Sequence, residues 1–172
     1  MSNAVLQHKV TELEFNSGID RAARESLADK LSNSLSEVYR LLVNTQIVHW
    51  NTQGPLFFSI HKLTESHYET LFKRVDDIAE RIRALGMPAP RSAKTLFERA
   101  NMKDLPAEAD LETQLRGLVV MNDNVVSGFR KLAKAADENT DYKTADLATD
   151  MIGELEEATW MLRATFSSPE LK

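Results

Sequence analysis

The 172-residue sequence contains no cysteine, which excludes a disulfide framework and thiolate ligands for a metal. Its longest uninterrupted apolar runs are only a few residues, too short to span a membrane. The N-terminus also lacks the hydrophobic core of a signal peptide. Because the absence of cysteine fits a reducing compartment, we expect a cytoplasmic protein without a membrane segment.

An excess of positive charge is also missing. The chain carries 21 Lys and Arg against 26 Asp and Glu, a net charge of −5 with its four histidines counted as neutral. An acidic protein is not built to coat nucleic acid by bulk electrostatics, although it can attract cations. Hydrophobic residues make up 42% of the sequence and charged residues 27%, which is ordinary for a globular protein and argues against extensive disorder.

No alternating strand pattern of useful length and no internal repeat are found, and apolar residues recur instead at steps of three and four. Asp20 or Ser26 can cap the first long helix, and Gly54-Pro55 stops it. The second ends at Gly86, before a rigid Pro-rich connector. The four long helices are expected over about 20–53, 59–85, 110–136 and 142–166, with a short helix over about 92–100.

Helices of about 25 residues are about 38 Å long and suit a four-helix bundle. The connection between the second and third long helices spans about 25 residues, so these two helices can run parallel by a long crossover. A single such crossover is the ferritin-like arrangement. We therefore predict an all-α, ferritin-like four-helix bundle over residues 19–167, with a short extra helix in the crossover and tails at residues 1–18 and 168–172.

Two imidazoles and three carboxylates form the most informative pattern in the chain: His49, His61, Glu65, Asp76 and Glu80. The last four fall within about 100° of arc on the second helix. The pair His61/Glu65 is separated from the pair Asp76/Glu80 by about 22 Å along that helix, so one ion cannot bind both. Two copies of the helix, antiparallel across a two-fold axis, would bring the opposite ends together. The spacing therefore predicts a metal site shared between subunits.

Each of these residues also has a plainer interpretation. His49 lies on the apolar stripe of its helix, where a hydrogen-bonded core histidine is common, and His61 alone is a surface residue or cap. The carboxylates alone are a solvated acidic face, paired with Lys73, Arg74 or Arg81. We interpret the remaining histidines, His8 and His67, as incidental.

The complete set favours a metal site because its members complement one another in charge, spacing and ligand type. Imidazole and carboxylate ligands without sulfur suit iron, manganese or zinc and leave positions open for water, oxygen or peroxide. The sequence has no Glu-x-x-His, the motif of di-metal centres held inside a single ferritin or manganese-catalase subunit. That absence favours the shared site.

The same residues carry a resemblance to a known family. The run His49-Trp50-Asn51-Thr52-Gln53-Gly54-Pro55, followed by Phe57, His61, Glu65, Asp76, Ile78-Ala79-Glu80-Arg81-Ile82 and Leu85-Gly86, resembles the Dps family of mini-ferritins. The similarity extends from about Ile19 to Phe166 and includes Trp160-Met161-Leu162.

This resemblance implies a hollow shell of twelve subunits that oxidises Fe(II), preferably with hydrogen peroxide, and stores the ferric product. It implies that His49, His61 and Glu65 come from one subunit, and that Asp76 and Glu80 come from its two-fold mate. Two positions depart from the family pattern. Glu65 stands where Asp is usual, and Lys62 stands where an acidic residue is frequent.

Two further roles are left open by the sequence. Trp50, next to His49, is either an electron donor that traps stray oxidising equivalents or a packing residue at the subunit interface. Asp141, Asp146 and Asp150 resemble acidic residues that line iron-uptake pores on the three-fold axes of similar shells, where a negative ring concentrates cations. Their alternative role is helix capping with ordinary solvation.

Two competing functions remain. Some relatives bind DNA through lysine-rich tails, but residues 1–25 hold three basic residues against four acidic ones, so we expect DNA binding to be at most secondary. A helical interaction module without metal chemistry is the other alternative, and it leaves the spacing of the histidines and carboxylates unexplained.

Overall fold

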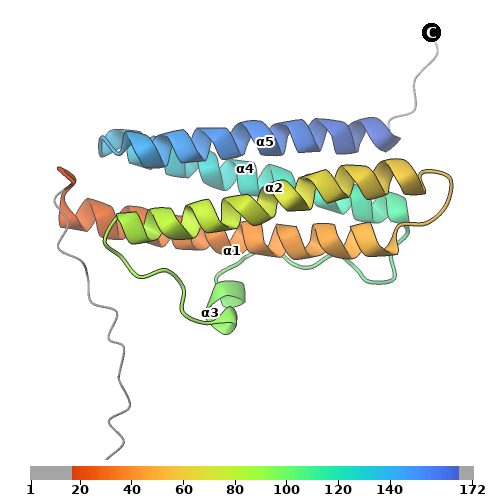
Figure 1. Cartoon of the computed structure of the whole chain (residues 1–172), viewed down its shortest axis with the longest axis horizontal. Helices are drawn as coiled ribbons and strands as arrows, with labels where there is room; N and C mark the ends of the chain where they lie inside the picture. Colours follow the sequence, from red (N-terminus) through yellow and green to blue (C-terminus); the bar gives the residue numbers. More distant parts are fainter. Residues whose placement is uncertain (1–16, 167–172) are drawn as a thin grey trace, which may run out of the picture.

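The computed structural model, shown in Figure 1, describes residues 17–166. The tails expected at residues 1–18 and 168–172 lie almost entirely outside these residues. Within them the chain forms helices and no strand. The helices are α1 Arg21–Asn51, α2 Phe57–Ala84, α3 Ala93–Glu98, α4 Leu111–Glu138 and α5 Tyr142–Phe166.

The four long helices form a bundle with α1 beside α2 and α4 beside α5, and the short α3 lies outside it against α1. In Figure 1, α2 and α4 run in the same direction, because residues 85–110 return along the bundle before α4 begins. The predicted all-α bundle with one long crossover and a short extra helix is therefore confirmed.

The helix boundaries agree with the predicted ranges to within a few residues. Asp110 caps α4, where its carboxylate accepts a hydrogen bond from the backbone of Thr113 at 2.7 Å. Asp20 occupies the N-cap position of α1 without such a bond. Two positive backbone angles mark the ends of the first two helices, φ +91° at Gly54 and +83° at Gly86, both in the region that favours glycine.

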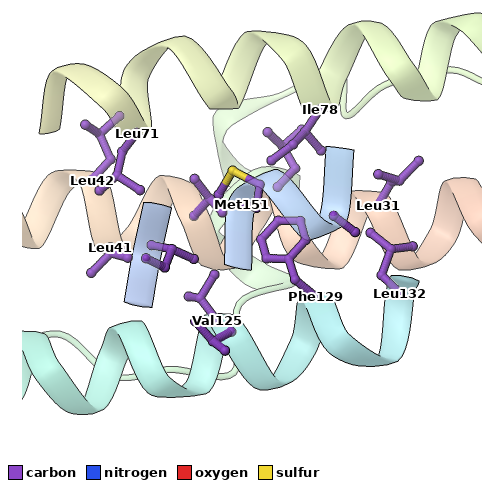
Figure 2. Close-up of a cluster of buried hydrophobic side chains, with 14 of the residues drawn as sticks. Leu31, Leu41, Leu42, Leu71, Ile78, Val125, Phe129, Leu132 and Met151 are labelled. Carbon is purple, nitrogen blue, oxygen red and sulfur yellow. The ribbon is translucent and has the colours of Figure 1, made fainter. Parts of the chain in front are cut away.

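The core lies between the four long helices. The stripe predicted on the first helix, which carries His49, is buried at every position: Leu27, Leu31, Leu35, Val38, Leu42, Thr45 and His49. Leu31, Phe129 and Met151 come from three helices and belong to one cluster of buried side chains (Figure 2), and Phe129 is fully buried. Since each helix turns its apolar face inward, burial of these stripes is what holds the bundle together. No helix within residues 17–166 is both long and apolar enough to cross a membrane.

Side-chain contacts to α1 fix the path of the crossover. Asn44 accepts a hydrogen bond from the backbone of Leu105 at 2.9 Å and donates to Asp104 at 3.0 Å. Arg40 donates to the same carboxylate at 2.9 Å. Leu105 also packs directly on Gly117 of α4, where an added Cβ would come within 2.4 Å of it. The crossover is thereby held against α1 and α4, and α4 is set parallel to α2.

Candidate metal centre

The turn between α1 and α2 brings the two predicted histidine ligands together. His49 lies in the last turn of α1, and His61 lies near the start of α2. Their rings are stacked, with centroids 3.8 Å apart and planes 16° from parallel. His49 is only 6% exposed, whereas His61 is half-buried. The pairing of these two imidazoles follows from the short loop, residues 52–56, that connects the helices.

The two imidazoles are also joined by a reciprocal pair of hydrogen bonds. Nδ1 of His49 lies 2.9 Å from the backbone oxygen of His61, and Nδ1 of His61 lies 3.1 Å from the backbone oxygen of His49. A carbonyl oxygen can only accept, so each Nδ1 carries the proton and donates it. In a neutral imidazole the lone pair is then on Nε2. Both histidines are therefore set in the tautomer that ligates a metal through Nε2.

Aromatic side chains fix the ring planes. Tyr68 meets His49 edge-on, with centroids 5.1 Å apart and planes at 76°. Phe57 stacks on His61 at 5.0 Å and 28°. Neither Tyr68 nor Thr64, whose hydroxyl also reaches His49, was predicted to have a role. Their spacing from His61 on the same helix, three residues for Thr64 and seven for Tyr68, is the signal that points to them.

Glu65, the third predicted ligand from this subunit, has a partner already. Nζ of Lys62 lies 2.6 Å from its carboxylate. This hydrogen bond, together with the charge of Lys62 and weaker effects of His49 and His61, holds the pKa of Glu65 below its usual value. The carboxylate is therefore ionised and ready to bind a cation, but a cation has to displace the ammonium group.

The remaining predicted ligands lie elsewhere on α2. Asp76 and Glu80 are exposed and lie about 16 Å or more beyond Glu65 along the helix. Within residues 17–166 of one subunit, no three His, Asp or Glu side chains lie close enough to hold a metal ion. The arginines considered as their partners are engaged with other carboxylates, Arg74 with Glu154 and Arg81 with Asp141.

The three aspartates of the predicted pore have different surroundings. Asp141 is 2% exposed and accepts hydrogen bonds from Arg81 at 2.6 Å and from the backbone of Thr144 at 3.0 Å. It therefore caps α5, the alternative role considered for it, and its charge is paired within the subunit. Asp146 and Asp150 are exposed. Asp146 lies 2.7 Å from Lys143, and Asp150 lies 3.7 Å from the guanidinium of Arg74.

Large apolar side chains are exposed around the turn that carries the histidines. They are Ile47, Trp50, Leu56, Phe57 and Phe58. Trp50 is 66% exposed and Phe58 is 71% exposed. A contiguous exposed stretch of this kind is typical of a surface that another protein covers.

Comparisons with known proteins agree with this fold. The profile of the ferritin-like domain matches residues 28–171. The chain is 34% identical over 152 residues to an uncharacterized low temperature-induced protein of Nostoc sp. PCC 7120, covering 87% of this chain and 85% of that one. It is 30% identical over 143 residues to the DNA protection during starvation protein of Agrobacterium fabrum, with 83% and 88% covered.

A crystal structure of the Dps protein from Vibrio cholerae O1, described as a member of a superfamily of ferritin-like diiron-carboxylate proteins, superimposes with a TM-score of 0.83. The two sequences are 30% identical, and the match covers 90% of this chain and 98% of that one. The chain belongs to the ferritin-like proteins, and within them to the Dps family of mini-ferritins.

Proposed function

We propose that this protein is a ferroxidase that oxidises Fe(II), with hydrogen peroxide as the preferred oxidant, and stores the ferric product inside a homo-oligomeric shell. Membership of the Dps family supports iron storage and protection against oxidative damage in the broad sense. The observation that carries the finer proposal is the reciprocal pair of hydrogen bonds between His49 and His61, which leaves both Nε2 atoms available to a metal beside the ionised Glu65.

The site is shared between two subunits in this proposal. His49, His61 and Glu65 of one subunit face Asp76 and Glu80 of its mate. Two features support it. The carboxylates lie too far along α2 to reach the histidines of their own subunit, and the apolar surface next to the histidines suits contact with a second copy. The full assembly we propose is a dodecamer.

The ligand set suits this chemistry. Carboxylates favour the harder ferric product over the ferrous substrate, and neutral imidazoles hold Fe(II) without fully neutralising it. Two ferrous ions supply one electron each to a peroxide, which takes up two protons and leaves as two water molecules. Because both electrons come from iron, no hydroxyl radical is released. Oxygen is the alternative oxidant.

An aromatic side chain near the site can donate an electron to any oxidising species that a one-electron reduction of the peroxide leaves behind. Trp50 is one candidate for this role, but its side chain is directed to the surface and suits the interface with the mate. Tyr68 is the ring that lies against His49. We therefore assign the interface role to Trp50 and regard Tyr68 as the better placed electron donor.

Iron reaches the cavity, in this proposal, past the exposed carboxylates of Asp146 and Asp150 around a three-fold opening. Asp141 supports the geometry of that helix start by capping α5.

DNA binding is the second candidate function, since the Agrobacterium fabrum relative is named for DNA protection. The net charge of −5 does not favour it.

The test of the shared site uses hybrids. A His49→Ala/His61→Ala variant and an Asp76→Asn/Glu80→Gln variant should each oxidise Fe(II) slowly, measured by ferric absorbance after peroxide addition. Hybrid oligomers assembled from the two should recover activity, because each interface between unlike subunits holds two sites, and one of the two combines intact ligands from both subunits. Absence of recovery in verified hybrids contradicts sharing, and full activity of either parent variant contradicts the ligand assignment.

A further inference from the structure

Thr64 lies at the centre of the contacts that orient the histidines. It is fully buried on the face of α2 that packs on α1, one turn after Ile60. Its hydroxyl oxygen lies 2.7 Å from the backbone oxygen of Ile60, 3.2 Å from that of His61, and 3.3 Å from Nδ1 of His49. Among residues 17–166 it is the only side chain that forms a hydrogen bond with the imidazole of His49.

The direction of these bonds follows from the groups involved. The single hydroxyl proton is donated to a backbone carbonyl, and the short distance favours that of Ile60. A lone pair of Oγ1 then faces Nδ1 of His49. Because the backbone oxygen of His61 also faces that nitrogen, the Nδ1–H group of His49 has two acceptors, at 2.9 and 3.3 Å.

We infer that Thr64 is a positioning residue for His49, and that its hydroxyl strengthens the binding of a divalent cation at Nε2 of that histidine. The inference rests on the proposed function, in which His49 is a metal ligand. A cation bound at Nε2 withdraws electron density from the ring and makes the Nδ1–H group a stronger donor. A second acceptor at Nδ1 therefore stabilises the metal-bound form.

The two histidines are not equivalent in this respect. His61 donates to one acceptor, the backbone oxygen of His49 at 3.1 Å. Thr64 thereby makes His49 the more firmly oriented ligand of the pair. The backbone acceptors cannot be removed by substitution, but the hydroxyl can, which makes its contribution measurable.

The chain offers a matched control. Thr45 on α1 is also fully buried, and its hydroxyl donates to the backbone oxygen of Leu41 at 2.8 Å, the same bond that Thr64 makes to Ile60. Thr45→Val and Thr64→Val therefore remove equivalent buried hydroxyls with nearly unchanged side-chain volume. Only the second removes an acceptor from His49. Thr64→Ser restores the hydroxyl without the methyl group.

The experiment titrates the assembled, metal-free protein with Co(II) under anaerobic conditions and follows binding by visible absorbance. Thr64→Val should weaken binding about tenfold, the lower end of the effect of removing an outer partner of a metal-ligating histidine. Thr45→Val should match wild type, and Thr64→Ser should recover most of the loss. In Fe(II) oxidation the defect should raise the half-saturating iron concentration more than it lowers the maximal rate.

Two results overturn the inference. One is Co(II) binding by Thr64→Val equal to that of Thr45→Val. The other is Thr64→Ser binding as weakly as Thr64→Val, which would assign the effect to packing of the methyl group. Failure of the proposed function is distinguishable, because Co(II) binding would then be insensitive to His49→Ala as well. Thermal melting of each variant checks that the fold is retained.

Discussion

His49 and His61 each donate Nδ1–H to the other's backbone carbonyl oxygen, at 2.9 and 3.1 Å, while their rings stack 3.8 Å apart. The relationship closes a ring of contacts between the last turn of α1 and the start of α2. It satisfies two backbone acceptors and two imidazole donors at once, and it sets both rings in the same tautomer. Each histidine is thus both a candidate ligand and the support of the other.

The first prediction concerns this mutual dependence. His49→Ala removes a donor to His61 and also frees the His61 ring from its stack, so the second substitution has less left to disrupt. In a double-mutant cycle on thermal stability, the losses from His49→Ala and His61→Ala should be less than additive, with a coupling of about 1 kcal/mol per subunit. Additive losses, measured by melting at one protein concentration, would show that the two contacts are independent.

The second prediction concerns Lys62. Lys62→Gln removes the ammonium that lies 2.6 Å from Glu65, so a cation no longer has to displace it. Co(II) should bind about two- to fivefold more tightly at low salt, a modest gain because the pair is exposed, and the gain should shrink as ionic strength rises. Lys143→Gln is the control, since Lys143 pairs with Asp146 at 2.7 Å in the same i, i+3 geometry.

The effect of pH has a definite sign in this variant. Lys62 holds the pKa of Glu65 below its usual value, so in wild type the carboxylate stays ionised to a lower pH. Without Lys62 that pKa rises toward the ordinary range. The carboxylate of Glu65 should therefore take up its proton at a higher pH in Lys62→Gln than in wild type, as measured by NMR titration of the metal-free proteins. An unchanged or lower midpoint would show that Lys62 is not what holds the Glu65 carboxylate ionised.

Much of the bundle could be predicted from the sequence because its information is periodic. The apolar stripes fixed the four long helices to within a few residues, and α5 was predicted with its observed bounds, Tyr142–Phe166. The length of the segment between α2 and α4 predicted the parallel crossover. The apolar stripe of α1 also placed His49 inside the bundle, where the structure has it.

What the sequence did not reveal depends on side-chain direction and on contacts between distant elements. Periodicity places Thr64 and His67 on the buried face of α2. It does not predict which polar atoms their side chains contact. Asp141 was considered for a pore because of its spacing. In the structure it is buried and accepts a hydrogen bond from Arg81, which lies 60 residues earlier in the chain. Such a pairing has no signal in one sequence.

The third prediction concerns His67. This histidine is buried, and we expect it to make the free energy of unfolding depend on pH. Neither of its ring nitrogens has a hydrogen-bond partner that meets ordinary geometry within residues 17–166. Burial lowers its pKa from 6.5 to about 4, and the carboxamide of Asn122 counteracts only part of that effect. The folded protein therefore holds His67 neutral where the unfolded chain would protonate it.

Between about pH 6.5 and pH 4 the unfolded state binds a proton that the folded state does not, so stability falls as the pH falls. At pH 5 the loss from this group is about 2 kcal/mol per subunit relative to pH 7.5. His67→Leu should lose correspondingly less stability over this range, by thermal melting at both pH values. All other titrating groups are common to the two proteins. Equal losses in both would contradict a buried neutral His67.

The fourth prediction separates Asp141 from the other acidic residues. Asp141→Asn keeps a side chain able to cap α5 but leaves Arg81 without its buried carboxylate partner. We expect a loss of about 2 kcal/mol per subunit at neutral pH, since one member of a buried ion pair is removed. Thermal melting measures it, and Asp146→Asn, at an exposed position, should cost little by comparison.

The pH dependence of that loss can be stated in advance. Burial by itself would raise the pKa of Asp141, but hydrogen bonds from Arg81 and Thr144 outweigh it and hold the pKa below its usual value. The stability that the ionised carboxylate contributes is therefore full above the ordinary aspartate pKa of about 3.9 and is lost as the pH falls through the lower folded-state value. The difference between wild type and Asp141→Asn should close over that acidic range.

The fifth prediction concerns iron uptake. Three copies of Asp146 and Asp150 around a three-fold opening supply six exposed carboxylates, and Asp146→Asn/Asp150→Asn removes their field without altering the histidines. Electrostatic focusing changes the arrival of cations by about tenfold or more, so iron should accumulate in the cavity more slowly at low ionic strength. Asp123→Asn, on the exposed surface of α4, is the control. The difference should fade as salt screens the field. Uptake by the double variant at the wild-type rate in low salt would leave both residues as ordinary surface aspartates near the start of α5.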